Sequence, residues 1–102
     1  MTKDKVLEVL KIYRAELERR GITKLENPSD RFDADVLIPD DHAYFSIKLT
    51  HCYEMLNSIE EFARADRMEK AFRWLGFIQG CFWSCGVYTI QEMKNHNRPD
   101  PE

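Results

Sequence analysis

Two runs of apolar residues with the same spacing constrain the fold of this chain more than any other feature. Within residues 41–63, apolar side chains recur at alternating intervals of four and three, at Phe45, Leu49, Cys52, Leu56, Ile59 and Ala63. Within residues 67–85, the same intervals relate Met68, Ala71, Leu75, Ile78, Phe82 and Cys85. A repeat of about 3.5 residues forms one apolar stripe on a helix, so two stripes joined by a short turn predict an antiparallel helical hairpin.

Acidic residues precede both helices of this hairpin. Asp40 or Asp41 is placed to cap the first helix, and Asp66 together with Glu69 is placed to cap the second. Such side chains accept hydrogen bonds from the free backbone N–H groups of a first helical turn. The hairpin is therefore expected over residues 41–63 and 67–85.

Two further helices are predicted on either side of the hairpin. Apolar residues from Val6 to Leu17 follow a helical period, so residues 4–20 form an amphipathic helix that Gly21 closes in a left-handed conformation. After Gly86 ends the hairpin, Thr89 and Glu92 match a capping box that begins a short helix over residues 90–96. The expected fold class is therefore all-α.

The segment 23–39 is a long connection that contains two prolines, an excess of acids and the short apolar run VLIP. The first interpretation is a loop that lies over the core, with VLIP extended. Unstructured connections of this length are uncommon in compact domains, so the alternative is a functional segment or one held by a neighbouring subunit. Residues 97–102 lack an apolar anchor and are expected to form a frayed tail.

Length and composition limit the architecture and the classes of partner. A chain of 102 residues forms one domain, 1–102, with a modest core that gains stability from burying more surface in a homo-oligomer. Hydrophobic residues make up 43% and charged residues 32%, as in a folded globular protein. The net charge of −3 argues against a protein that coats nucleic acid, so nucleic acid is an unlikely partner except at a local patch.

No constellation of residues predicts catalysis, a metal or a cofactor. The three cysteines include no CxxC pair, and the histidines and cysteines lack the four-ligand spacing of a zinc site. His51 and Cys52 are adjacent on a helix, so their side chains diverge by about 100° and do not form a catalytic pair. With no signal peptide and no apolar run of ~20 residues, the chain is expected to be a cytoplasmic protein that is not an enzyme.

A row of small residues lies on the second hairpin helix, roughly opposite its apolar stripe. The row consists of Gly76, Gly80 and Ser84, and large side chains flank it at Phe72, Phe77 and Trp83. Small side chains let another helix approach closely, so we expect these six residues to form the contact between subunits. The alternative is that the first helix and the VLIP run fill this groove.

The densest basic cluster begins just before the same helix. It consists of Arg64, Arg67, Lys70 and Arg73, with Trp74 among them. Guanidinium groups bind phosphate and an indole stacks on a base, so these five residues are the predicted site for an anion or a nucleotide. The alternative is a solvated face whose charges pair with Glu60, Glu61 and Glu69.

The sequences EKAFRWLGFIQGCFW and GVYTIQEMKNHNRP, preceded by HCYEML, resemble small proteins of tailed bacteriophages and prophages. The shared signature is KAxRWLGFxQG followed by TIxExK, and the resemblance covers residues 51–99, about half of the chain. The hairpin is also similar, at the level of the fold, to phage anti-CBASS sponges that sequester cyclic-nucleotide signals of bacterial defence. The spacing after Arg-Trp differs from theirs, so no ligand residue is transferred.

The leading hypothesis is a phage accessory protein that acts by stoichiometric binding in the host bacterial cytoplasm, as an anti-defence inhibitor or a sponge for a nucleotide signal. Its expected partners are a second copy of itself and a host defence protein or nucleotide signal. One alternative is a protein–protein adaptor or inhibitor that uses the acidic segment 23–41. Another is a nucleic-acid-binding regulator that uses the face from Arg64 to Arg73.

Overall fold

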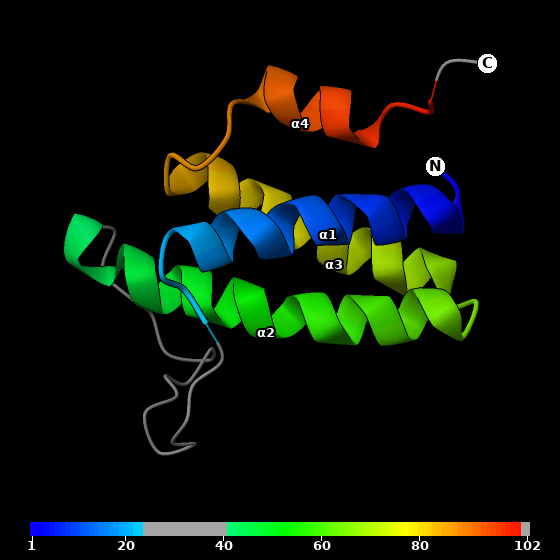
Figure 1. Ribbon diagram of the computed structural model, residues 1–102, viewed down its shortest axis with the longest axis horizontal. Helices are drawn as coiled ribbons and strands as arrows, with labels where there is room; N and C mark the ends of the chain where they lie inside the picture. Colours follow the sequence, from blue (N-terminus) through cyan, green and yellow to red (C-terminus); the bar gives the residue numbers. More distant parts are fainter. Residues whose placement is uncertain (24–40, 101–102) are drawn as a thin grey trace.

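The computed structural model describes residues 1–23 and 41–100, and this part of the chain is all helical, with no strand. The elements are α1 (Lys3–Arg19), the 3₁₀ turn η2 (His42–Tyr44), α2 (Phe45–Arg64), α3 (Met68–Ser84) and α4 (Ile90–Asn97) (Figure 1). The all-α prediction is confirmed. The predicted bounds differ most from the observed ones at the start of α2.

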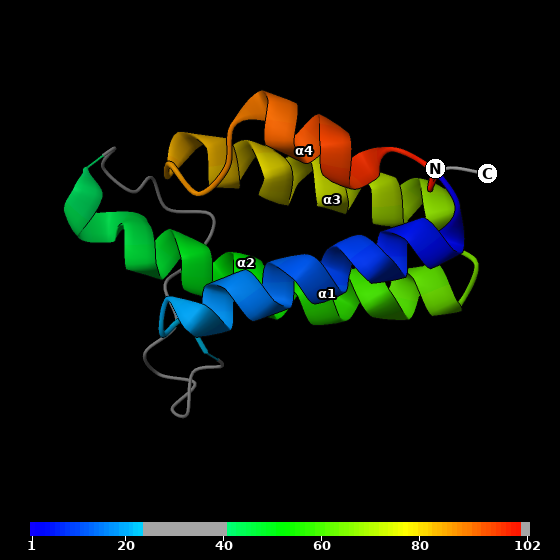
Figure 2. The same cartoon turned by 45° about the horizontal axis from the view of Figure 1, so that its top comes forward.

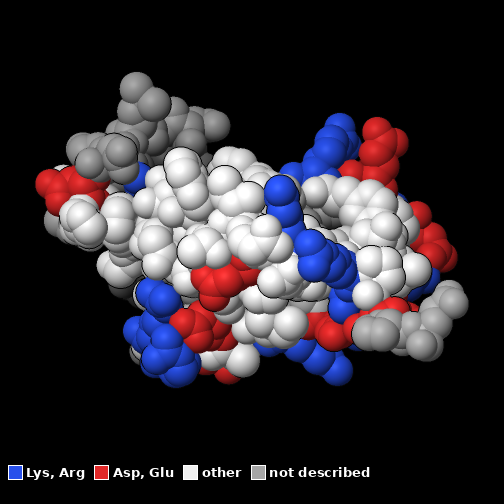
Figure 3. Space-filling view, turned by 90° about the horizontal axis from the view of Figure 1, so that it is seen from above, with Lys and Arg blue, Asp and Glu red and all other residues white. Residues whose placement is uncertain are grey.

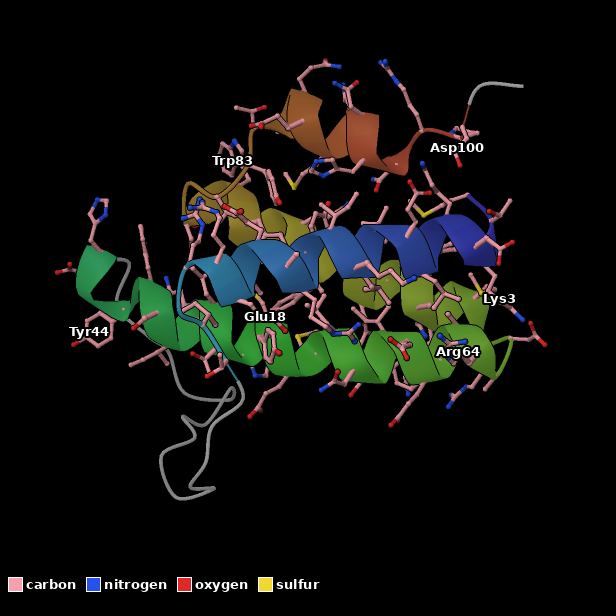
Figure 4. The ribbon with its side chains drawn as sticks, in the orientation of Figure 1. Lys3, Glu18, Tyr44, Arg64, Trp83 and Asp100 are labelled. Atoms are coloured by element: carbon pink, nitrogen blue, oxygen red, sulfur yellow. The ribbon has the colours of Figure 1, made fainter. Side chains whose placement is uncertain are left out.

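The helices pack as a layered bundle around α2 and α3. Helix α3 follows α2 after a turn at residues 65–67 and lies beside it along its length (Figure 1). Helix α1 packs along α2, and the short α4 lies against α1 on the side away from α2 (Figure 2). The N-terminus lies at the end of the bundle where α2 turns into α3 (Figure 1), and Figure 4 places Asp100 near the same end.

The two apolar stripes are buried together, as their spacing indicates. The stripe residues that are less than a tenth exposed are Leu49, Cys52, Leu56, Ile59, Ala63, Ala71, Leu75, Ile78, Phe82 and Cys85. Helix α1 adds Val6, Val9, Leu10, Tyr13 and Leu17, and α4 adds Met93. Each fully buried Leu, Ile, Val or Phe side chain contributes about 1.5–3 kcal/mol relative to its exposed state, so this interface is the main source of stability.

Two glycines close helices as predicted. Gly21 and Gly86 have φ angles of +81° and +72°, in the left-handed region that favours glycine. The next residue then donates its N–H back to the helix, from Ile22 to the Leu17 carbonyl at 2.9 Å and from Val87 to the Phe82 carbonyl at 2.8 Å. These bonds satisfy carbonyl groups that a helix end otherwise leaves free.

The capping box at the start of α4 is also confirmed. The Thr89 hydroxyl accepts the Glu92 backbone N–H at 3.1 Å, and the Glu92 carboxylate accepts the Thr89 N–H at 2.9 Å. The backbone and side-chain hydrogen bonds from Thr89 hold the pKa of Glu92 below its usual value. The charged form of Glu92 therefore stabilises the first turn of α4.

The predicted cap of α3 is wrong. The N-cap residue is Arg67, which makes no side-chain cap bond, and Asp66 instead ends α2 in the left-handed conformation with φ +60°. The Arg67 N–H donates to the Phe62 carbonyl at 2.8 Å, which is the same kind of bond that follows Gly21 and Gly86. Asp66 therefore occupies the left-handed position that glycine occupies at the ends of α1 and α3. The Asp66 carboxylate pairs with Lys3 of α1.

The predicted cap of α2 by Asp41 is also wrong, because the turn η2 separates Asp41 from the helix. The N-cap residue is Tyr44, and its N–H donates to the backbone carbonyl of Asp41 at 3.0 Å. The alternative cap, Asp40, lies outside the described residues, as do the connection 24–40 and its VLIP run. The helix therefore begins at Phe45 rather than at residue 41.

The end of the chain differs from the expected tail. Asn97 is the last residue of α4, and its side chain exchanges hydrogen bonds with Gln79 on α3, at 2.8 and 3.3 Å. Asp100 accepts a hydrogen bond from Lys5 of α1 at 3.0 Å. Residues 97–100 are therefore anchored to the bundle by polar contacts, which apolar periodicity does not reveal.

Candidate functional site

A hollow between α2 and α3 brings together groups that bind anions and aromatic rings. Its volume is about 530 Å³, and its lining residues are His51, Met55, Arg73, Trp74 and Phe77. His51 and Met55 are one turn apart on α2, and Arg73 and Phe77 are one turn apart on α3, so each pair shares a helix face. The volume lies within the range of small-molecule sites.

The position of Trp74 is fixed by Phe62 of α2. The two rings meet edge to face, with centroids 5.0 Å apart and planes at 83°. The Phe62 ring also lies under two cations, at 4.6 Å from the Lys70 ammonium and 5.3 Å from the Arg67 guanidinium. Lys70 is 5.8 Å from the Trp74 ring centroid, so these cations interact mainly with aromatic faces beside the hollow.

Arg64 lies outside the hollow and takes part in an ion-pair network. Its side chain donates to Glu60 at 3.2 Å, and Glu60 also accepts from Arg14 of α1 at 3.1 Å. Figure 4 shows Arg64 at the end of the bundle where Lys3 and Asp100 also lie. For Arg64, the interpretation as part of a solvated, paired face fits the structure.

Arg73 differs from Arg64 in its surroundings. Within residues 1–23 and 41–100, Arg73 makes no hydrogen bond or ion pair, although it borders the aromatic wall of the hollow. A guanidinium in this position can bind an anion without first breaking an ion pair or hydrogen bond with a residue that the structure describes. The structure therefore separates the five predicted ligand residues into Arg73 and Trp74 in the hollow, and Arg64, Arg67 and Lys70 outside its lining.

The six residues predicted to form a subunit contact share one exposed face of α3. Gly76, Gly80 and Ser84 are exposed, and so are Phe72, Phe77 and Trp83, the last two at 56% and 59%. A Cβ atom added at Gly76 or Gly80 would have no described atom within 4 Å. Helix α1 therefore does not fill the groove, and the part of that alternative that involves VLIP lies outside the described residues.

Seen from the side that carries α4, the molecule shows a large uncharged area, and acidic and basic side chains stand both within this face and around it (Figure 3). Trp83 borders two smaller hollows, one of about 340 Å³ beside Phe45 and one of about 260 Å³ against α4, where Ile90 is 53% exposed. Figure 4 places Trp83 near the end of the bundle opposite Arg64. Trp83 of α3 and the ion-paired Arg64 of α2 thus lie toward opposite ends of the bundle.

Several residues of the site were not identified in the sequence. His51 and Met55 line the hollow, and Phe62 supports Trp74, but the spacing of each is also that of an ordinary helix margin. The i, i+4 relationship of His51 and Met55 is the signal that places them together, once α2 and α3 are paired.

The prediction that Cys52 and Cys85 are buried is confirmed, and Cys81 is half-buried.

Neither a metal centre nor a membrane-crossing helix is found in the described ranges. No three His, Cys, Asp or Glu side chains there are grouped closely enough to hold a metal ion. No helix in the same ranges has both the length and the apolar character that a crossing requires. No family model, curated protein or solved structure matches this chain.

Proposed function

We propose that this chain is a non-enzymatic binding protein that holds a nucleotide-type ligand, an anion joined to an aromatic base, in the hollow between α2 and α3. The observation that carries the proposal is that Arg73, which makes no ion pair or hydrogen bond with a described residue, lies beside Trp74 and Phe77 in one hollow. His51 and Met55 form the opposite wall, with one polar ring and one adaptable apolar side chain.

The chemistry of the wall suits the two parts of such a ligand. A phosphate bound by the Arg73 guanidinium would contribute about 1.5–3 kcal/mol, and a base stacked on an aromatic ring about 1–3 kcal/mol. Trp74 is held in place by Phe62, so little side-chain freedom is lost on binding. Together these contacts are sufficient for a specific small-molecule complex.

We place this binding activity in a phage accessory protein that sequesters a nucleotide signal of host defence. The resemblance of residues 51–99 to phage and prophage proteins supports the setting, and RWLGFIQG, its core, contains Arg73, Trp74 and Phe77. Sequestration requires one ligand for each site and no turnover. We further propose that the α2–α3 helical hairpin assembles as a homo-oligomer through the exposed face of α3.

Isothermal titration against cyclic mono- and dinucleotides, linear nucleotides, nucleosides and inorganic phosphate tests this function. Saturable binding of a nucleotide with unchanged ligand on recovery is expected, with weaker binding of the nucleoside or of phosphate alone. The variant Trp83→Phe leaves Trp74 as the single tryptophan, and its fluorescence should change on binding. If no nucleotide saturates the folded chain at millimolar concentration, the proposal is contradicted.

A further inference from the structure

Two cations at the start of α3 lie over one aromatic ring of α2, beside the hollow. The Lys70 ammonium is 4.6 Å from the centroid of the Phe62 ring, and the Arg67 guanidinium is 5.3 Å from the same centroid. An aromatic face attracts a cation, but a neutral ring does not cancel its charge. Phe62 therefore positions two positive charges without neutralising either of them.

No carboxylate neutralises these two charges in the part of the chain that the structure describes. There, the side chains of Arg67 and Lys70 make ring contacts but no ion pair or hydrogen bond. Glu60, one of the acids expected to pair with this cluster, binds Arg64 instead. Two like charges three residues apart on a helix repel each other, and an anion bound to both would relieve that repulsion.

Trp74 connects this pair of cations to the hollow. Its ring lines the hollow together with Arg73, and the centroid of the same ring is 5.8 Å from the Lys70 ammonium. Lys70 and Arg73 are three residues apart on α3, so they are neighbours on the helix surface. A base stacked on Trp74 would therefore have one cation in the hollow and a second one beside it.

We propose that Arg67 and Lys70 form a second phosphate subsite, so that the chain selects a nucleotide with one phosphate on each side of its nucleoside. This inference rests on the proposed function, in which Arg73 binds the first phosphate. A nucleoside bisphosphate and a dinucleotide with a terminal phosphate both have this arrangement. A nucleoside monophosphate lacks the second group, and a nucleoside diphosphate carries both groups at one end.

Lys70 is the residue of this subsite that determines specificity. Its ammonium contacts both Phe62 and Trp74, so it is positioned before a ligand binds, and little side-chain freedom is lost when it meets a phosphate. The contact is charge-assisted, and only a ligand with the second phosphate can make it.

Isothermal titration of the full-length chain at fixed ionic strength tests this selectivity. The nucleoside bisphosphate or the phosphorylated dinucleotide should bind roughly tenfold more tightly than the monophosphate, as expected for one added charge-assisted contact. The better ligand of the two identifies the class. The diphosphate, with a similar charge at one end only, should lack this advantage, and equal affinity for it would overturn the proposal.

Three variants separate Lys70 from the general charge of the surface. Lys70→Gln should abolish the preference and leave the affinity for the monophosphate unchanged, whereas Lys70→Arg should retain the preference. Lys11→Gln removes the same charge from an exposed position of α1 and is the matched control, which should also retain it. Circular dichroism establishes that each variant is folded.

A second measurement needs no base. Nuclear magnetic resonance of the Arg67 and Arg73 guanidinium groups should show saturable shifts with inorganic phosphate, and Lys70→Gln should remove the Arg67 response alone. If nucleotides bind through Arg73 without a preference for the second phosphate, and Arg67 does not respond, the second subsite is wrong and the proposed function stands. If Arg67 responds but no nucleotide saturates the chain, the proposed function and the selectivity both fail, and only an anion site is left.

Discussion

The side-chain amide of Gln79 on α3 donates a hydrogen bond to the hydroxyl of Tyr13 on α1, at 2.9 Å. The same amide nitrogen donates to Asn97 of α4 at 2.8 Å, and Nδ1 of His96 lies 3.2 Å from the Tyr13 hydroxyl. Tyr13 is fully buried, and burial raises its pKa to about 12, so its hydroxyl stays protonated. This polar cluster of Tyr13, Gln79, His96 and Asn97 joins α1 and α3 to the short helix α4.

The variant Tyr13→Phe tests the contribution of this cluster. It keeps the ring, whose centroid is 4.9 Å from that of Phe82, and removes the hydroxyl. We expect the free energy of unfolding in urea to fall by about 1–2 kcal/mol, because Gln79 and His96 lose a partner in a part-buried site. The matched control is Tyr53→Phe, whose hydroxyl bonds Glu18 at the surface. An equal loss in both variants would show that the cluster has no special role.

A second prediction concerns the pH dependence of stability. Burial among the rings of Tyr13 and Tyr88 lowers the pKa of His96 below its usual 6.5, with Lys5 acting in the same direction and Glu92 opposing it. Between the folded and unfolded pKa values, the unfolded chain binds more protons. Stability therefore falls as the pH decreases through about 6.5.

Melting temperatures between pH 7.5 and 5.5 check this effect, in a range where most carboxylates remain charged. The decrease should be smaller in His96→Gln than in the natural sequence. His42 is exposed, so His42→Gln serves as the control and should keep the full decrease. A pH profile that is the same in His96→Gln would mean that His96 does not couple to folding.

Local sequence chemistry was sufficient to predict the four helices and most of their ends. The apolar period identified α1, α2 and α3, and the Thr89–Glu92 capping box identified α4. This box and the caps at Gly21 and Gly86 were identified because their hydrogen bonds lie within a few residues. Asp66 was misassigned because a left-handed residue and an N-cap residue occupy neighbouring positions in so short a turn. Asp, unlike most residues, suits both.

Contacts between helices were not predictable to the same degree. The Gln79–Tyr13 bond and the Phe62–Trp74 packing both depend on how far each helix is rotated about its axis. A single sequence gives the apolar face but not this rotation at side-chain precision. The basic cluster could be located in the sequence, but the choice between its two interpretations could not be made there, and the structure separates Arg73, which lines the hollow, from Arg64, which pairs with Glu60.

A third prediction concerns assembly through the exposed face of α3. Gly80→Leu should dissociate the proposed homo-oligomer, because a leucine side chain would block close approach of a second helix. The subunit itself should stay folded, since the added Cβ has no described atom within 4 Å and leucine favours a helix by almost 1 kcal/mol relative to glycine.

Light scattering at tens of micromolar measures this change. The control is Glu61→Leu, which adds leucine to an exposed position of α2 and should leave the assembly intact. A natural chain that is monomeric at this concentration would remove the proposed interface. Dissociation of both variants would point to a general effect of surface leucine.

The last prediction separates the ligand site from an ordinary charged surface. Arg73→Ala should weaken nucleotide binding roughly ten- to hundredfold, which corresponds to the loss of one charge-assisted contact of about 1.5–3 kcal/mol. Its melting temperature should change little, because Arg73 makes no ion pair or hydrogen bond with another described residue. Phe77→Ala should also weaken binding without unfolding the chain, since this ring is more than half exposed.

Arg64→Ala is the matched control for this prediction. It removes the same charge from the preceding helix but breaks the ion pair with Glu60, at a cost of at most about 1 kcal/mol in stability. Nucleotide affinity should stay unchanged, apart from a small loss at low ionic strength through the weaker overall field. If both arginine variants lower the affinity equally, the nucleotide responds to general positive charge and not to the α2–α3 hollow. If neither does, Arg73 belongs to a solvated face, and the ligand site lies elsewhere.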